Sequence, residues 1–264
     1  MKIIAIANQK GGVGKTMTTE SFGAGLARAG KKVLLIDMDP QGSLTTSLGI
    51  EEPDSLDLTL TNLLYGTMQD MELEKDEGVV HCEEGIDLIP GNIELSGMES
   101  TLITAMNRER ILDKYIKEQN FASRYDYILI DCMPSLGMLT INALTCADTV
   151  LIPVRASFLS LKGMEQLFRT IYKVKKNLNP HLTIEGILVT MLDNRTNNAK
   201  DIVSLIRNTY ENNVYVFSNT IPVSVRAEEA PASGQSIFSY DGKGKVAKAY
   251  EAVTDEFLYN EGEM

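Results

Sequence analysis

One stretch decides the predicted fold: Ala7-Asn8-Gln9-Lys10-Gly11-Gly12-Val13-Gly14-Lys15-Thr16. It follows a short apolar run, Ile3–Ile6, which is typical of a buried strand, and it precedes a helical pattern over Thr18–Arg28. A strand, a glycine-rich turn and a helix N-terminus form a polyphosphate site, because glycines let the backbone approach the anion and the helix amides face it. In such a loop Lys15 bridges the β and γ phosphates, and Thr16 gives its hydroxyl to Mg²⁺. We therefore expect ATP and Mg²⁺ as cofactors.

The loop departs from the general phosphate-loop pattern at one position. The strict pattern has a glycine six residues before the lysine, where this chain has Gln9. The residues present are Lys-Gly-Gly-Val-Gly-Lys-Thr, with a second lysine, Lys10, at the start of the loop. This is the deviant Walker A motif, and in it the chain resembles the ParA/MinD superfamily of P-loop ATPases.

Length and composition indicate a globular protein without a membrane span. The chain has 264 residues, of which 44% are hydrophobic and 6% aromatic, and this composition suits an aliphatic core. No apolar run reaches the roughly 18 residues that suggest a membrane span, and a strand that begins at residue 2 leaves no room for a signal peptide. The chain has three cysteines, an odd number without metal-type spacing, so we expect a reduced, cytoplasmic location.

The net charge of −11 is concentrated in one segment. Twelve acidic residues and one lysine lie between Glu51 and Pro90, so the rest of the chain sums to zero. From Arg155 to Lys248 there are thirteen Lys and Arg against eight Asp and Glu. A basic face is therefore compatible with an acidic protein, although both runs can equally be ordinary solvated surface.

Apolar strands alternate with helical patterns along the whole chain, which predicts an α/β fold: a doubly wound, mostly parallel sheet with helices on both faces. We expect residues 1–264 to form a single P-loop ATPase domain with its ligand beyond the carboxyl ends of the strands. The acidic stretch 67–84 is expected as an exposed loop or edge. Strands are predicted at 3–6, 32–37, 86–90, 127–131, 149–154, 184–190 and 215–217. Helices are predicted at 18–28, 59–65 (closed by Gly66), 93–105, 108–118, 161–178, 200–210 and 244–259.

Carboxylates at two strand ends complete the predicted phosphate site. Asp131 closes an all-apolar strand, where a charge is costly unless a cation or hydrogen bonds compensate it, and so occupies the Walker B position. Asp37 and Asp39 flank the end of the second strand. Phosphoryl transfer needs a group that orients the attacking water, and Asp39 is our candidate, with Asp37 the weaker one. The candidate magnesium ligands are Thr16, Asp39 and Asp131.

Further motifs resemble those of the ParA/Soj partition ATPases. Asp37–Gly42 looks like their switch I and Ile130–Gly137 like their switch II. The other matches follow in the same order along the chain, at Ile89–Gly97, Val150–Val154, Thr190–Thr196 and Ile221–Pro231. Each match alone is weak, but together they are collinear over nearly the whole chain.

The resemblance implies an ATP-bound sandwich homodimer, in which Lys10 reaches the partner's phosphates and Gly11 lies at the close subunit contact. It also places Pro222, Ser224 and, more loosely, Met191 at the adenine. Catalytic roles fall to Lys10, Lys15 and Asp39. The implied nucleotide-binding residues are Lys10, Gly11, Gly12, Val13, Gly14, Lys15, Thr16, Met17, Met191, Pro222 and Ser224.

Three positions depart from the family pattern. Met133 replaces the first of two prolines usual in switch II, which makes that segment less rigid. Ser224 stands where the family often has Asn, and Lys162 stands where Glu is common.

The resemblance also implies partners. Relatives of this kind bind duplex DNA without sequence preference when ATP-bound, and a ParB-like DNA-binding protein then stimulates hydrolysis. We therefore expect a nucleoid-associated protein with a basic stripe that neutralises phosphates. The candidate DNA-binding residues are Arg195, Arg207, Arg226, Lys243, Lys245 and Lys248.

Three alternatives stay open at this point. A MinD-like membrane-associated positioning ATPase would need a basic amphipathic C-terminal helix, whereas this chain ends in an acidic segment, Phe257–Met264, so we expect no membrane binding. An iron–sulfur carrier or nitrogenase-type reductase shares the deviant loop, but Cys132 and Cys146 show no Cys-x-x-Cys pairing. The third is a DNA-bound nucleotide switch whose hydrolysis is too slow to matter.

Overall fold

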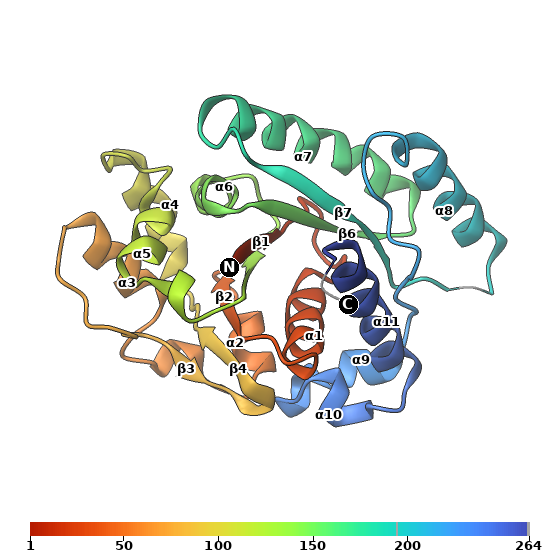
Figure 1. The fold of residues 1–264 in the computed structure, drawn as a ribbon, viewed down its shortest axis with the longest axis horizontal. Helices are drawn as coiled ribbons and strands as arrows, with labels where there is room; N and C mark the ends of the chain where they lie inside the picture. Colours follow the sequence, from red (N-terminus) through yellow and green to blue (C-terminus); the bar gives the residue numbers. More distant parts are fainter. Residues whose placement is uncertain (194, 263–264) are drawn as a thin grey trace.

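The computed structural model describes residues 1–193 and 195–262, and within them the chain forms a seven-stranded sheet (Figure 1). The strand order is β3-β4-β2-β5-β1-β6-β7. Neighbouring strands pair in parallel, except that β3 runs antiparallel to β4 at one edge. The strands are β1 (Lys2–Ile6), β2 (Val33–Met38), β3 (Val80–His81), β4 (Ile86–Ile89), β5 (Tyr127–Cys132), β6 (Thr149–Arg155) and β7 (Thr183–Thr190). The predicted fold class is confirmed.

Helices cover both faces of this sheet, since successive side chains of each strand point to opposite sides. In β1, Ile3 and Ala5 join one hydrophobic cluster, while Ile4 and Ile6 join the other. The first cluster is closed by α3 (Leu60–Met68), α4 (Leu95–Thr104), α5 (Ile111–Glu118), α6 (Met138–Cys146), α7 (Phe158–Asn177) and α8 (Asn197–Tyr210). The second is closed by α1 (Lys15–Arg28), α2 (Ser43–Ser47), α9 (Val225–Glu229), α10 (Ile237–Asp241) and α11 (Lys245–Asn260).

Some predicted elements need correction. The helix expected to end before Gly66 continues to Met68, and Gly66 lies inside it, where an added Cβ would come within 2.9 Å of Leu73 Cδ2. The strand predicted at 215–217 is a single bridge between Val216 and Ile187. The acidic stretch 67–84 is, as expected, largely exposed loop with β3 as the sheet edge.

The sheet register sets the position of the candidate site. β1 lies between β5 and β6, and Ile6 is paired with Asp131 at the carboxyl ends. On the other side of β5, Asp37 of β2 is paired with Asp131. The loop that follows β1 therefore emerges beside the two aspartates, at the edge of the sheet where ligands of such folds bind.

None of the described helices is both long enough and apolar enough to cross a membrane.

Candidate active site

The glycine-rich loop between β1 and α1 has a backbone suited to an anion. Gly12 and Gly14 have φ angles of 66° and 83°, in the left-handed region that favours glycine. Gly14 is the N-cap of α1, so the helix begins at Lys15, three residues earlier than predicted. Left-handed residues within such a turn direct successive amides into one concavity, and the positive end of α1 adds to its attraction for phosphate.

Contacts from outside the loop hold this conformation. The side chain of Asn8 accepts a hydrogen bond from the Lys10 amide (3.0 Å) and donates one to the carbonyl of Pro153 (2.7 Å). The Thr190 hydroxyl, at the end of β7, donates to the carbonyl of the buried Val13 (2.7 Å). Asn8 and Thr190 were not predicted as site residues, although both lie within the motifs described above.

Thr16 and Asp131 meet directly at the carboxyl end of β5. The Thr16 hydroxyl donates to Asp131 Oδ2 over 2.7 Å, and the Thr19 hydroxyl lies 3.3 Å from Oδ1. Burial raises the pKa of Asp131 to about 8, and the charge of Asp37 adds to this, while the bond from Thr16 and the charge of Lys15 oppose it. A buried carboxylate beside a hydroxyl is an oxygen donor set of the kind that Mg²⁺ prefers, so the residues present fit the predicted metal.

The structure separates the two candidate aspartates of switch I. Asp37 is fully buried and accepts hydrogen bonds from the Thr45 amide (2.8 Å) and hydroxyl (2.7 Å) at α2. Burial raises the pKa of Asp37 to about 6, against the lowering effect of these bonds. Asp39 is half-buried, accepts from the Gln41 amide (3.0 Å), and its charge acts on both Lys15 and Asp131. This geometry supports Asp39 as the group facing the phosphates and Asp37 as an anchor for the loop.

The two lysines of the loop have different surroundings. Lys15 is 7% exposed, with its Nζ 3.5 Å from the carbonyl of Lys10. Burial lowers the pKa of Lys15, and the charges of Asp131 and Asp39 counteract this. The Nζ of Lys10 donates instead to the hydroxyl of Ser157, over 3.2 Å, just before α7.

Two further loop positions were predicted to contact the nucleotide. Gly11 is exposed, and an added Cβ would meet nothing within 4 Å in this chain. Met17, in the first turn of α1, is half-buried and packs against the second hydrophobic cluster.

Two of the three residues predicted near the adenine lie at a cleft of 540 Å³. A parallel bridge joins Leu192 to Pro222, with a 2.9 Å bond from the Leu192 amide to the carbonyl of Ile221. Pro222 and Ser224 line the cleft. Met191, which has a φ of 49°, connects it to the phosphate loop, because its Cε lies 3.7 Å from the Cβ position of Gly14. Within the matched segment Thr190–Thr196, Asn194 lies outside the described residues, as does the side chain of Lys162 in α7.

The predicted DNA-binding residues divide into two groups. Those at α9–α11 are exposed: Arg226, Lys243, Lys245 and Lys248. Arg195 is also exposed and bonds to Asp193, lowering the pKa of that carboxyl to about 2. Arg207, by contrast, has a 27% exposed side chain that donates to the carbonyls of Phe217 (2.9 Å) and Ser218 (3.4 Å). Its guanidinium therefore ties α8 to the segment after it.

The cysteines and switch II also occupy defined positions. Cys132 and Cys146 are buried, and each thiol lies against a backbone carbonyl, of Ile130 (3.8 Å) and Ala143 (3.3 Å) respectively. Within the residues that the structure covers, no three His, Cys, Asp or Glu side chains are grouped so as to hold a metal ion. Met133 is partly buried and packs against the first hydrophobic cluster.

Comparison with known proteins finds relatives that match nearly the whole chain. A family model described as an AAA domain matches residues 1–184. The chain is 43% identical over 261 residues to the sporulation initiation inhibitor protein Soj of Bacillus subtilis, covering 98% of this chain and 99% of that protein. It is 41% identical over 259 residues to the chromosome partitioning protein ParA of Myxococcus xanthus, covering 97% and 88%.

The fold also matches a nucleotide-bound solved structure. Cobyrinic acid a,c-diamide synthase from Mycobacterium smegmatis, with bound ATP analogue and magnesium, has a TM-score of 0.84 and 35% identity to this chain. The likeness covers 99% of this chain and 97% of that one. The ligands of that relative are those predicted here from the phosphate loop.

Proposed function

Because the chain belongs to the ParA/Soj family of partitioning ATPases, we propose that it is an ATP-driven DNA-partitioning switch. It binds ATP with Mg²⁺, pairs as an ATP-sandwich homodimer, and in that state binds duplex DNA without sequence preference. A ParB-like DNA-binding partner stimulates hydrolysis and so releases it. The cargo is chromosome, plasmid or mobile-element DNA, and the place of action is the cytoplasm, on the nucleoid.

The contact between Thr16 and Asp131 carries the proposal, since it joins the phosphate loop to the Walker B strand end. These two residues would hold Mg²⁺, directly or through water, with Asp39 as the third candidate ligand. When bound, the ion supplies positive charge that neutralises the transferring phosphoryl group. Asp39 orients the attacking water, and Lys15 stabilises charge on the β and γ phosphates.

Lys10 makes pairing a condition of hydrolysis in this proposal. Its Nζ exchanges the Ser157 hydroxyl for the phosphates of the partner subunit, where a second cation stabilises the transition state. A Cβ added at the exposed Gly11 would meet nothing within 4 Å among the described residues, which leaves room for the partner's close approach. The base then occupies the cleft lined by Pro222 and Ser224, next to Met191.

The packing of α11 favours this function over a membrane role. Phe257 and Leu258, on its apolar face, are buried in the core, and the Phe257 ring meets Phe22 edge to face at 5.1 Å. A membrane-binding helix must present its apolar face to lipid. The buried, carbonyl-bonded thiols of Cys132 and Cys146 likewise suit core packing rather than cluster ligation.

Three variants test the proposal: Lys15→Ala, Lys10→Ala and, as a control, Lys117→Ala in the exposed ion pair with Asp113. Nucleotide binding, mass in solution, gel shift of duplex DNA and phosphate release are measured for each with ATP. Lys15→Ala should lose nucleotide binding and, with it, every later step. Lys10→Ala should bind ATP but stay monomeric and bind DNA weakly, while Lys117→Ala behaves as the native chain.

Two results would contradict the proposal. One is ATP-driven pairing and turnover by Lys10→Ala at the native level. The other is equal DNA binding, or none, by the native chain and Lys15→Ala. Phosphate release with and without DNA also separates a turning-over ATPase from a switch that barely hydrolyses.

A further inference from the structure

An apolar groove of 510 Å³ lies between α3, α4 and the segment 71–77, and we call it the α3–α4 groove. It shares no residue with the phosphate loop or with the cleft beside Pro222. Its volume falls in the range of ligand sites. The lining residues include Tyr65, Met71, Glu77, Glu94, Gly97 and Met98.

The groove presents apolar side chains to solvent. Tyr65 and Met71 are 51% and 57% exposed, while Met98 is buried at 3%. Methionine adapts its shape to a partner's side chains, which suits a binding surface. Gly97 keeps the α4 wall low, because a Cβ added there would meet nothing within 4 Å.

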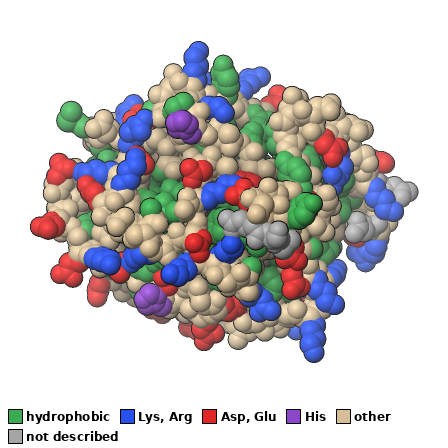
Figure 2. Space-filling view, in the orientation of Figure 1, with side chains coloured by type: hydrophobic (Ala, Val, Ile, Leu, Met, Phe, Trp, Pro, Cys, Tyr) green, Lys and Arg blue, Asp and Glu red, His purple; other side chains and the backbone are tan. Residues whose placement is uncertain are grey.

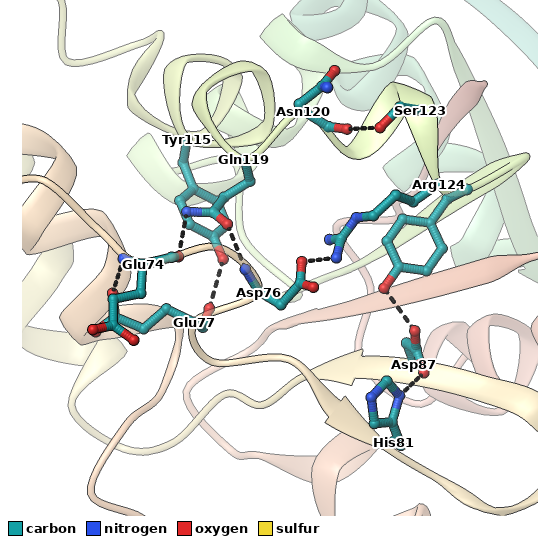
Figure 3. Close-up of polar contacts among 11 residues, drawn as sticks. Glu74, Asp76, Glu77, His81, Asp87, Tyr115, Gln119, Asn120, Ser123 and Arg124 are labelled. Carbon is teal, nitrogen blue, oxygen red and sulfur yellow. Dashed lines mark hydrogen bonds and ion pairs between the residues drawn. The ribbon is translucent and has the colours of Figure 1, made fainter.

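The wall formed by segment 71–77 is fixed in place by α5 and the turn after it (Figure 3). The Gln119 side-chain amide accepts from the Asp76 amide (3.0 Å) and donates to the carbonyl of Glu74 (3.1 Å). The Tyr115 hydroxyl donates to the carbonyl of Glu77 (3.2 Å), and Arg124 forms an ion pair with Asp76. The groove is therefore preformed, which lowers the cost of binding.

The charge around the groove is predominantly negative, with Lys75 the one cation in the segment 71–77. Its two charged lining residues, Glu77 and Glu94, are carboxylates, and Glu72 and Glu74 lie along the same wall. In Figure 2 several acidic side chains lie at the left edge, with Lys and Arg side chains among them, where Figure 1 has the loop after α3. The cation of Lys114, on α5, is paired with Asp70 and Glu118. An anionic membrane or a nucleic acid would be repelled from such a surface, whereas a cationic partner would be attracted.

We propose that the α3–α4 groove is the docking site for a cationic amphipathic helix of another protein. Its apolar side chains, spaced three and four residues apart, fill the groove over Met98, and its Lys or Arg side chains lie near Glu94 and Glu77. A helix fits better than an added strand, because the groove is walled by helices and side chains rather than by an open sheet edge.

Both helices of the groove connect to the strand ends of the candidate active site. On α4, Glu99 accepts bonds from the amides of Met138 and Leu139, at the start of α6 directly after switch II. At the start of α3, the Leu60 amide donates to the carbonyl of Pro90 (2.8 Å).

The α3 connection continues to switch I. The next amide after Pro90, of Gly91, donates to the Thr45 hydroxyl (3.0 Å), which holds Asp37. A helix docked between α3 and α4 would therefore contact elements that are connected through hydrogen bonds to switch I and to the residues directly after switch II. This inference rests on the proposed function: the groove is the surface through which the partner protein would stimulate ATP hydrolysis.

The test uses a fluorescein-labelled synthetic helix with leucines on one face and lysines on the other, titrated with the full-length protein and followed by anisotropy. Gly97→Phe fills the groove without a backbone clash, and the control is Ser96→Phe, an exposed neighbour on the same helix that does not line the groove. We expect Gly97→Phe to weaken binding at least tenfold and Ser96→Phe to change it less than twofold. Glu94→Gln should weaken it more than Glu51→Gln, which removes an equal charge outside the groove.

The outcomes separate this inference from the proposed function. Equal peptide binding by Gly97→Phe and Ser96→Phe would overturn the groove as the site. Equal binding of a peptide with glutamates in place of lysines would overturn the cationic partner. ATP binding and peptide-free turnover are measured on the same variants, which alter no residue of the phosphate site. If ATP binding and turnover are normal but the variants bind the peptide equally, the docking inference is wrong and the proposed function stands. If the native chain neither binds nor hydrolyses ATP, the proposed function is wrong.

Discussion

At the scale of single residues, buried carboxyl groups lie in and beside the phosphate site, and burial disfavours their ionised form. Glu20, one turn beyond Thr16 on α1, is 1% exposed, and its Oε1 meets no hydrogen-bond partner among the described residues. Burial raises the pKa of Glu20 well above its ordinary value, and the nearby charge of Glu84 adds to this against the bond from Ser47. The folded chain therefore favours the protonated form of Glu20, while the unfolded chain ionises it near pH 4.5.

This difference predicts how stability depends on pH. Above about pH 4.5 the folded state holds a proton that the unfolded state has lost, so rising pH weakens folding by up to ~1.4 kcal/mol per pH unit until the folded pKa is passed. Glu20→Gln removes this loss, because it resembles the neutral acid. Urea unfolding between pH 5 and 8 should show the free energy of unfolding of Glu20→Gln gaining on the native chain as pH rises. Glu51→Gln, at an exposed position, should show a constant difference, and parallel curves for Glu20→Gln would contradict the prediction.

Sequence motifs identify the chemistry of the phosphate site but not the hydrogen-bond partners of its carboxylates. The motifs predicted Thr16 and Asp131 as ligands of one magnesium ion, and the structure shows a hydrogen bond of 2.7 Å between the two side chains. Sequence spacing could not assign the roles of Asp37 and Asp39. The two differ because Thr45 donates hydrogen bonds to Asp37, and Thr45 lies on a short helix that no sequence pattern predicted. Such side-chain partners come from segments distant in sequence, where periodicity carries no information about them.

At the scale of elements, α1 and α11 pack unusually closely, and a glycine makes this possible. A Cβ added at Gly25 of α1 would lie 2.3 Å from the hydroxyl oxygen of Thr254 on α11. One turn from Gly25 along α1 the Phe22 ring meets the Phe257 ring edge to face, and two turns from it the Thr18 hydroxyl lies 3.1 Å from that of Tyr250. The first helix of the phosphate site is therefore held by the last helix of the chain.

Gly25→Ala should destabilise the chain by about 1–3 kcal/mol, because overpacking outweighs the gain in helix propensity of up to about 1 kcal/mol. Gly97→Ala is the control: Gly97 lies in the first turn of α4, a Cβ added there would meet nothing within 4 Å, and the substitution should stabilise slightly. In a Thr254→Ala background Gly25→Ala should cost less, with a coupling of roughly 1 kcal/mol or more in urea unfolding. Additive effects of the two substitutions would show that the helices adjust without strain.

The elements themselves were largely predictable where apolar periodicity is strong. The buried strands from β1 to β7 lie within a residue or two of their predicted positions, apart from the two-residue edge strand β3. The errors arose where tertiary contacts decide. Gly66 suggested a helix end, yet it lies inside α3, where the side chain of Leu73 packs against it. The run 215–217 has the composition of a strand but pairs only through Val216. The α3–α4 groove has no sequence signal, because it is made by segments that meet only in the folded chain.

At the scale of the whole molecule, charge is unevenly distributed over one fold. The segment from Glu51 to Pro90 carries the entire net charge of −11, and it forms the sheet edge and the exposed loop after α3. Exposed lysines gather instead around the start of α11, at Lys243, Lys245 and Lys248. Under the proposed function, the basic region faces DNA phosphates while the acidic edge keeps DNA away, so the fold sets the orientation of binding.

Neutralising the acidic edge should therefore strengthen DNA binding. Glu51, Glu72 and Glu83 are exposed, and replacing all three with Gln removes repulsion without altering the basic residues. Gel shifts with ATP at 50 mM salt should show a several-fold higher affinity for duplex DNA than the native chain. The gain should fade near 300 mM salt, because screening shortens the reach of the removed charges, so the affinity of the variant should fall more steeply with salt than that of the native chain. Lys15→Ala in the same background should abolish binding, and an unchanged affinity at 50 mM salt would show that the acidic edge has no part in orienting DNA.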